Sequence, residues 1–160
     1  SQNQGTLTAE APNLTYLPNS NYHGDDSFTF TASDGTDVSE VQMVHLTVTP
    51  VNDAPVVNGQ GVTVSEDTRL SIALTAVDIE DQALTYQVVS SPSQGTLTGE
   101  APNLTYTPAT DYHGPDSFSF KVNDGAADSQ TATVNLNVGK VNDAPMANTQ
   151  AVNTDEETAV

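Results

Sequence analysis

Oxygen-bearing side chains recur in two identical stretches of the chain. Residues 51–55 read Val-Asn-Asp-Ala-Pro, and residues 141–145 repeat the same five letters. Carboxylate and amide oxygens are ligands that calcium takes, and proline fixes its own φ while holding the preceding residue extended. We call these stretches the first linker (51–55) and the second linker (141–145). Each is predicted to be a stiff connector that a metal ion makes rigid.

A further group of acids lies between the linkers. Asp78, Glu80 and Asp81 are three acids within four residues, directly after the apolar alternation of residues 70–76. Like charges this close are unfavourable unless they are hydrated or neutralised. A hydrated turn explains any single acidic turn well, but several turns of this chain are acidic. Calcium collects roughly six to eight oxygens from such loops, so the set favours a metal site.

The candidate metal ligands are the polar residues of the linkers and of the turns expected beside them. They are Asn52, Asp53, Asp78, Glu80, Asp81, Asp124, Glu66, Asp111, Asn142 and Asp143. Successive loops of a β-sandwich alternate between its two ends. We therefore expect 78–81 and 123–125 beside the first linker, and Glu66 with 111–116 beside the second.

The charge balance narrows the range of partners. The chain has 160 residues with 21 Asp plus Glu against 3 Lys plus Arg, a net charge of −18. Such a surface repels nucleic acid and anionic lipid and attracts cations. No apolar run reaches the roughly 20 residues that span a membrane, so direct membrane insertion is not expected, and the first residues do not resemble a signal peptide. Cysteine is absent, so bound metal is the expected substitute for disulfides.

An internal repeat of 90 residues organises the chain. The stretch 5–8 matches 95–98, 11–16 matches 101–106, and the first linker matches the second, without a gap. Residues 1–50 are thus the C-terminal part of one repeat, 56–140 a complete repeat, and 146–160 the first strand of a third. Since 1–50 alone would bury too little surface, we expect it to borrow strands by swapping with another chain.

Apolar residues within the complete repeat alternate with a period of two. Examples are Phe118, Phe120 and Val122, with serine and lysine between them, and turn signals such as Asn123-Asp124-Gly125 separate the runs. Short strands at about ten-residue spacing, without a helical stretch, predict an all-β fold. The expected architecture is an antiparallel Greek-key β-sandwich of the immunoglobulin kind, with about seven strands per repeat.

The chain resembles the cadherin-like tandem repeats of large bacterial surface adhesins. The resemblance rests on Leu-x-Tyr-x-Pro at 104–108, Tyr-x-Gly-x-Asp-Ser-Phe at 112–118, Asp-Gly at 124–125 and the two linkers. It implies calcium at the joints between repeats, with the ligands named above, and a stiff extracellular stalk on a bacterial cell surface. The linkers are shortened relative to cadherins, and Asn21 stands where the complete repeat has Asp111. Fewer ions per joint than in animal cadherins are therefore expected.

The predicted function is structural. We expect a calcium-stiffened extender segment of an extracellular adhesin, with neighbouring repeats of the same chain as partners, supporting cell adhesion. The alternative is a calcium-dependent module that binds polysaccharide or a copy of itself. No hydrolase, phosphate-binding or zinc motif occurs, so an enzyme is not expected. His23 and His113, which precede glycines, are more simply explained as turn residues than as zinc ligands.

Overall fold

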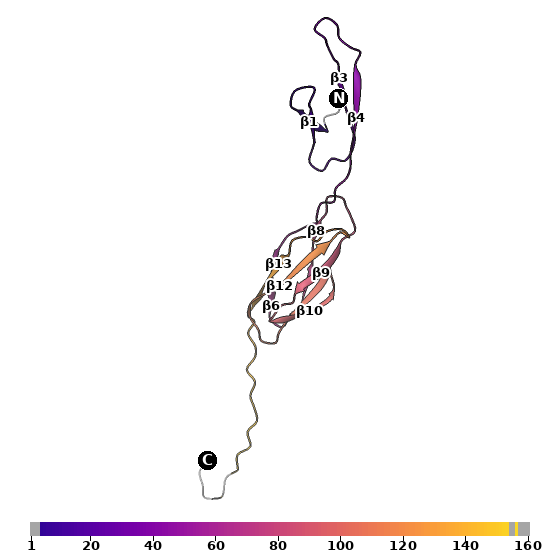
Figure 1. Ribbon diagram of the computed structural model, residues 1–160. Helices are drawn as coiled ribbons and strands as arrows, with labels where there is room; N and C mark the ends of the chain where they lie inside the picture. The colour runs from indigo at the N-terminus through magenta and orange to yellow at the C-terminus, as the bar shows by residue number, and fades with distance from the viewer. Residues whose placement is uncertain (1–3, 154–155, 157–160) are drawn as a thin grey trace. The chain divides into compact units, whose positions relative to one another are not determined.

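The computed structural model describes residues 4–153 and 156, and this part of the chain is built from strands alone (Figure 1). It contains no helix long and apolar enough to cross a membrane. The first repeat contributes β1 (Gly5–Thr8), β2 (Thr15–Pro18), β3 (Gly24–Phe30) and β4 (Gln42–Val48). The all-β prediction is confirmed.

The complete repeat, all of whose residues are described, contains nine strands. They are β5 (Val56–Val57), β6 (Gln60–Ser65), β7 (Leu70–Ala73), β8 (Ala76–Val77), β9 (Thr85–Ser90), β10 (Gly95–Glu100), β11 (Asn103–Pro108), β12 (Gly114–Asn123) and β13 (Ala132–Gly139). Two of the nine, β5 and β8, are only two residues long and pair with each other. The seven longer strands agree with the number expected from the apolar alternation.

The strands form a sandwich with one parallel pair. One sheet has the order β6-β13-β12-β9 and the other the order β10-β11-β7. Strand β11 pairs antiparallel with both of its neighbours. Strands β6 and β13, the first long strand and the last strand of the repeat, pair parallel with Val64 opposite Val138. This pair departs from the purely antiparallel expectation, because strands far apart in sequence are free to run in the same direction when no hairpin joins them.

The 90-residue repeat is visible in the strand register. Gly5 pairs with Pro18 in the β1–β2 hairpin, and Gly95 pairs with Pro108 in the β10–β11 hairpin. Strands β1 to β4 are therefore the counterparts of β10 to β13. The last stretch, 146–160, was predicted to begin a third repeat. Its described residues 146–153 form no strand, and the other positions except 156 lie outside the described residues.

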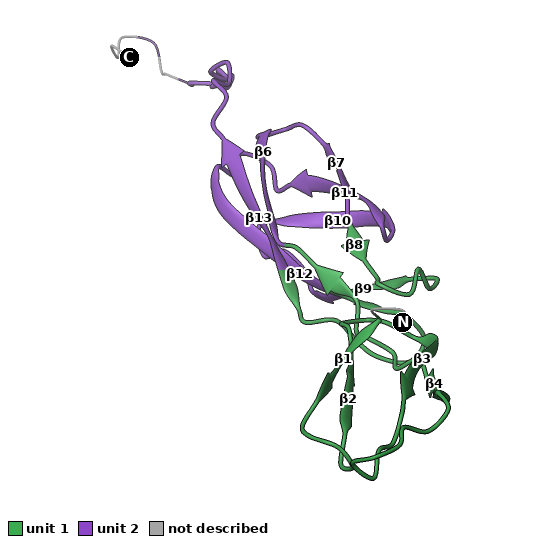
Figure 2. Ribbon diagram, turned by 90° about the horizontal axis from the view of Figure 1, so that it is seen from above, with its two compact units in different colours: residues 1–58, 75–87, 121–132 green, residues 59–74, 88–120, 133–160 purple. Residues whose placement is uncertain are grey.

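The chain divides into two compact units, which Figure 2 colours separately. Unit 1 comprises residues 1–58, 75–87 and 121–132, and unit 2 comprises 59–74, 88–120 and 133–160. Unit 2 holds most of the apolar core. Its buried side chains are Val64, Ile72, Leu74, Leu104, Tyr106, Phe118, Phe120, Val134, Leu136 and Val138. The period-two alternation thus identified the buried face of the long strands.

A buried acid explains the recurring Tyr and Asp-Ser-Phe motifs. Asp116 accepts hydrogen bonds from Ser93 N and Gln94 N, both at 2.9 Å, and from the hydroxyl of Tyr106 at 2.8 Å. The same tyrosine packs over Gly95, where an added Cβ would lie only 2.5 Å from a ring carbon. Tyr16 donates to Asp26 in the first repeat over 2.7 Å. The motif therefore fastens the turn before β10 to β12.

Candidate metal sites at the two linkers

The first linker is held by the side chain of Asn52. Its Nδ2 donates to Asp124 Oδ2 at 2.9 Å, and its Oδ1 accepts from Gln82 Nε2 at 2.7 Å. The neighbouring Asp53 N donates to Glu80 Oε2 at 3.4 Å, a weak bond. All five residues belong to unit 1. We call Asn52, Asp53, Asp78, Glu80, Gln82 and Asp124 the first-linker cluster.

Asp124 is positioned by its own turn. Its Oδ1 accepts from Ala126 N and Ala127 N, both at 2.7 Å, and Gly125 supplies the positive φ of 100° that the turn needs. This arrangement leaves Oδ2 for Asn52. The hydrogen bond from Ala127 N, with those from Asn52 and Ala126 N, holds the pKa of the Asp124 carboxyl below its usual range. The carboxylate is therefore charged at neutral pH and available to a cation.

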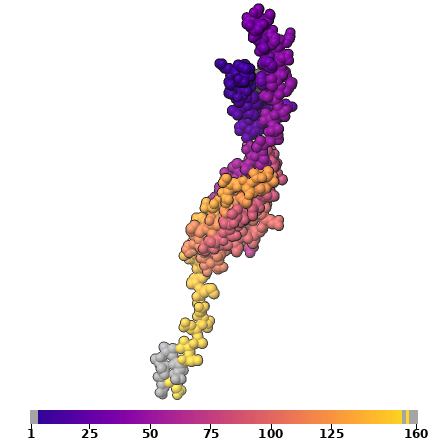
Figure 3. Space-filling view, viewed as in Figure 1, coloured from indigo at the N-terminus to yellow at the C-terminus, as the bar shows by residue number. Residues whose placement is uncertain are grey.

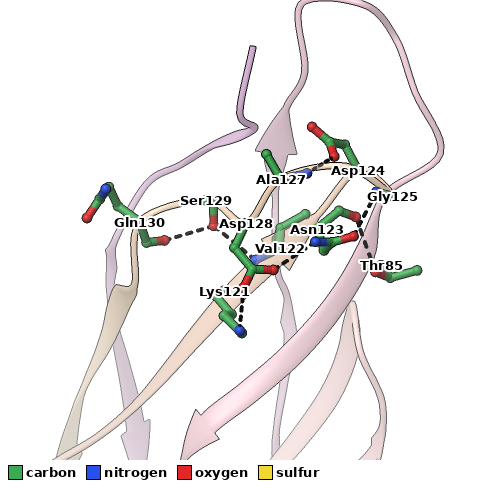
Figure 4. Close-up of polar contacts among 10 residues, drawn as sticks. All are labelled: Thr85, Lys121, Val122, Asn123, Asp124, Gly125, Ala127, Asp128, Ser129 and Gln130. Carbon is green, nitrogen blue, oxygen red and sulfur yellow. Dashed lines mark hydrogen bonds and ion pairs between the residues drawn. The ribbon is translucent and has the colours of Figure 1, made fainter. Parts of the chain in front are cut away.

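A second network supports the same turn from β12 (Figure 4). Lys121 Nζ donates to Asp128 Oδ2 at 2.6 Å, and Asn123 Nδ2 donates to Asp128 Oδ1 at 2.8 Å. Asn123 Oδ1 in turn accepts from Gly125 N at 2.7 Å. Lys121 is the cation of this network, and it is paired with Asp128. Asp124 has no ion-pair partner among the described residues.

The loop after β8 is organised by Asp78. Its Oδ1 accepts from Glu80 N and Gln82 N, both at 3.1 Å, in a tight Asx-type turn. The Asp78 side chain is only 8% exposed. Its second oxygen, Oδ2, is buried and has no hydrogen-bond partner among the described residues. A buried carboxylate oxygen without a partner is costly, so this atom points to a ligand that the loop is built to receive.

A hollow beside the first linker collects polar groups. It has a volume of about 250 Å³, and its lining includes Asp53, Glu80, Asn21, His23 and Pro50. Asn21 adopts a left-handed φ of 61°, like Asp111 at the equivalent position, where φ is 59°. The hollow therefore combines a linker acid with an acid of the loop after β8 and an amide of the first repeat.

The donor set of the first-linker cluster fits calcium. Carboxylate and amide oxygens are hard ligands, whereas zinc sites draw on cysteine and histidine. Asp78 provides an unused buried oxygen, and Asp53 and Glu80 meet at one hollow. Among the described residues, the carboxylates of this cluster do not converge on one point, and the amide of Asn52 contacts Asp124 and Gln82. An ion there would replace some of these amide contacts.

Three acids converge at the second linker. Single carboxylate oxygens of Asp67, Asp111 and Asp143 lie within 4.8 Å of one another, and all three side chains are exposed. Two oxygens bound to one calcium ion lie at most about 5 Å apart, since each is about 2.3–2.6 Å from the metal. The three acids belong to unit 2, and together with Glu66 we call them the second-linker cluster.

Glu66 joins this cluster through the backbone of the second linker. Its side chain is only 2% exposed, and Oε1 accepts from Val141 N at 2.5 Å. Oε2 lies 3.7 Å from Nδ1 of His113. Glu66 N itself donates to Gly139 O, which closes the parallel β6–β13 pair. The buried glutamate therefore fastens the start of the second linker to the complete repeat.

The predicted site residues fall into two groups in space. Asn52 meets Asp124, and Asp53 meets Glu80, whereas Glu66 contacts the second linker and Asp111 meets Asp143. Asp81 makes no hydrogen bond or ion pair with these groups among the described residues, and Asn142 donates only to Asp143 O at 3.2 Å. Metal binding by all ten residues stays a prediction.

Sequence reasoning missed two residues. Gln82 completes the Asn52 contacts, and Asp67 is one of the three converging acids. Gln82 directly follows the acidic run 78–81, and this position could have identified it as a member of the cluster. Asp67 adjoins Glu66 and has a left-handed φ of +62°, which no apolar pattern reveals.

Comparison with known proteins agrees with this architecture. Residues 1–47 and 52–137 each match the family described as bacterial Ig domain. The human extracellular matrix organizing protein FRAS1 is 39% identical over 101 residues, which is 59% of this chain and 2% of that protein. Integrin beta-like protein B of Dictyostelium discoideum is 26% identical over 111 residues, covering 59% of this chain and 6% of that protein. The chain thus spans only a few per cent of the length of these relatives.

A solved structure shows the same fold. The human mucin-like protocadherin EC1-2 structure has a TM-score of 0.51 and 20% identity, and the match covers 88% of this chain and 82% of that one. At that identity the likeness concerns the fold alone. Tandem repeats of this kind are typical of extracellular surface proteins. Since the family match covers most of the residues, this chain belongs to the bacterial Ig domain family, as tandem Ig-like, cadherin-like repeats.

Proposed function

We propose that this chain is an extender segment of a bacterial surface adhesin, made stiff by calcium bound at its linkers. Its membership of the bacterial Ig domain family and its tandem repeats support an extracellular, structural role. The net charge of −18 supports a cation as the partner. Neighbouring repeats of the same chain are the other partners of each ion.

The unsatisfied oxygen of Asp78 carries the proposal. Among the described residues Oδ2 is buried without a partner, in a loop whose Glu80 and Gln82 already contact the first linker. A turn built only for hydration would leave its carboxylate oxygens open to water. Burying one of them without a hydrogen bond has a cost that a bound cation offsets.

The chain's own residues explain how the linker would respond. Asp53, Glu80 and Asp124 carry like charges around one short connector, whose Asn52 side chain bonds to Asp124 and Gln82. Calcium, when bound, supplies the positive charge that removes this repulsion and joins the linker to the loops. A ligand that binds only the folded, ordered linker stabilises that state by mass action.

Polysaccharide binding finds less support. Sugar recognition by stacking needs exposed aromatic faces, but Tyr106, Phe118 and Phe120 are almost completely buried and Tyr86 and Tyr112 are half-buried. The complete repeat, all of whose residues are described, therefore has no fully exposed aromatic side chain. We propose the structural role in preference to glycan binding.

The test is a calcium titration by calorimetry, with melting and X-ray scattering curves recorded in calcium and in chelator. We expect binding with a Kd of about 10⁻⁴–10⁻³ M, as in other extracellular modules, a higher melting temperature in calcium, and a stiffer particle. Magnesium serves as the control, since it dehydrates reluctantly and demands octahedral geometry. Absence of binding heat, with identical melting and scattering in both conditions, would refute the proposal.

A further inference from the structure

We propose that Gln82 is a positioning residue that lowers the calcium affinity of the first linker, because its side chain occupies an oxygen of Asn52 that the ion would take. This role rests on the proposed function, since calcium binding at the first-linker cluster is the event that Gln82 opposes. Gln82 Nε2 donates to Asn52 Oδ1 at 2.7 Å, and Oδ1 is the only oxygen of that side chain. Calcium takes oxygen ligands, so an N–H group at this oxygen competes with the ion.

Most side-chain oxygens around this contact already accept hydrogen bonds. Oδ1 of Asp78 and Oδ1 of Asp124 each accept from two backbone N–H groups of their own turns. Those donors are fixed by the backbone. Oδ2 of Asp124 and Oδ1 of Asn52 accept from side chains instead. These two oxygens are therefore the ones that a side-chain movement would release to an ion.

The Gln82 side chain reaches the linker from a fixed point. Its backbone N donates at 3.1 Å to Oδ1 of Asp78, the carboxylate whose Oδ2 is buried without a partner among the described residues. The Gln82 side chain is half-buried, whereas Asn52 is exposed. Because the glutamine has less conformational freedom to lose, its contact with the linker costs little side-chain entropy.

The contact also determines what Asn52 does to Asp124. With Oδ1 held by Gln82, the other end of the amide faces Asp124, and Nδ2 donates to Oδ2 of that carboxylate at 2.9 Å. The first linker and the turn that carries Asp124 lie side by side, purple against orange in Figure 3. Gln82 therefore withholds two oxygens from an ion, Asn52 Oδ1 directly and Asp124 Oδ2 through the orientation of the asparagine.

Loss of the Gln82 donor should have opposite effects with and without calcium. In the metal-free chain the contact ties the linker to the loop after β8, so its loss loosens the linker. In calcium its loss removes a hydrogen bond that the ion has to break. The net strength of an ordinary hydrogen bond corresponds to roughly a threefold to tenfold change in a dissociation constant. A residue that only supported the folded site would change both properties in the same unfavourable direction.

The experiment is a calorimetric calcium titration of the parent chain and of Gln82→Met. Methionine keeps the unbranched shape of glutamine and has no N–H donor in its side chain. The Kd for calcium should fall about threefold to tenfold. Gln82→Ala, which removes the amide altogether, should shift the Kd in the same direction. Melting curves in chelator check that both variants fold.

Gln130→Met is the matched control. Within the described part of the chain Gln130 makes no side-chain hydrogen bond, and its backbone oxygen accepts from Ser129. The same substitution there should leave the Kd for calcium unchanged.

Hydrogen exchange in chelator provides the second readout. The amide of Asp53, in the linker, should exchange about threefold faster in Gln82→Met than in the parent chain. An unchanged or higher Kd in Gln82→Met, with calcium still bound by the parent chain, would overturn the role of Gln82 and leave the proposed function in place. Unchanged exchange at Asp53 would overturn that role as well. A parent chain that binds no calcium would refute the proposed function itself, and the role of Gln82 with it.

Discussion

Asn52 donates from Nδ2 to Oδ2 of Asp124 across 2.9 Å, although 72 residues separate them in sequence. Gln82 donates to the Oδ1 of the same asparagine. A flipped amide would set its oxygen against the carboxylate and its NH₂ group against that of Gln82, so both contacts fix one orientation. The first linker is therefore tied to two loops even without a metal ion.

Replacing Asn52 by aspartate should loosen the first linker in chelator. The substitution removes the donor to Asp124 and sets two carboxylates against each other. We expect the amides of Asp53, Ala126 and Ala127 to exchange about tenfold faster, a change that corresponds to 1.4 kcal/mol of local opening. Hydrogen exchange measured by NMR reports each of these amides.

Asn142→Asp is the matched control. It makes the same change in an identical five-residue context, but within the described part of the chain Asn142 donates only to the neighbouring Asp143 O. Exchange near the second linker should change little in chelator. Equal loosening by both variants would show that the long-range contacts of Asn52 do not hold the linker.

Asp78→Asn should remove much of the calcium response. The asparagine keeps Oδ1 for Glu80 N and Gln82 N but replaces the unpartnered oxygen with an amide group. We expect a melting temperature in chelator within about 5 °C of the parent chain, since the turn persists. The rise on adding calcium should fall by at least about half, as one ligand of the predicted site is lost.

Asp81→Asn separates ligation from charge in that experiment. It removes one negative charge from the same loop, at a side chain for which the described residues show no polar contact with the cluster. If Asp81→Asn reduces the calcium response as much as Asp78→Asn does, the response reflects general electrostatic attraction. Ligation by Oδ2 of Asp78 would then be ruled out as its cause.

Asp111→Asn should have opposite effects with and without calcium. Three acids converge here, and the first repeat carries Asn21 at the equivalent position with nearly the same positive φ. In chelator the substitution relieves repulsion, and the melting temperature should rise by about 2 °C. In calcium it removes a ligand, so binding should weaken. A change of the same sign in both conditions would argue against an ion among these acids.

Sequence reasoning succeeded where a repeating pattern controls the structure. The alternation of Phe118, Phe120 and Val122 identified a buried face, and the alternation of loops between the ends of a sandwich placed Asp124 near Asn52 and Asp111 near Asp143. It could not foresee positions where the backbone takes a left-handed φ. Asp81 has a φ of +56° and makes no hydrogen bond or ion pair with the cluster among the described residues, and its part in metal binding stays a prediction.

The parallel pairing of β6 with β13 could not be predicted from the sequence either. Residues 60–65 and 134–139 are joined by no short turn, so nothing local specifies their relative direction. Gln82 was overlooked for a related reason, since an uncharged amide acquires a role only when the folded chain brings Asn52 to it. Such contacts depend on the completed tertiary structure.

The hydrogen bond from the Tyr106 hydroxyl to Asp116 predicts how the stability of the fold depends on pH. Burial by itself would raise the pKa of Asp116, but hydrogen bonds from Ser93 N and Tyr106, with others from the backbone, lower it overall. Burial and the bond to Asp116 raise the pKa of Tyr106 well above its usual value. Asp116 therefore stabilises the fold above its unfolded pKa of about 4, and that contribution is lost as the pH falls through the lower folded value.

Tyr106→Phe should lower the free energy of unfolding by about 2 kcal/mol at neutral pH, because a buried carboxylate loses a donor. The tyrosine's own contribution is present below its unfolded pKa of about 10 and disappears as the pH rises through the raised folded pKa. The stability gap between parent and variant should accordingly be constant near neutrality and narrow in alkali. Urea denaturation at several pH values measures it. Tyr86→Phe, which removes a half-buried hydroxyl without a hydrogen bond in the described residues, should show no such gap, and equal losses in both variants would contradict the assignment.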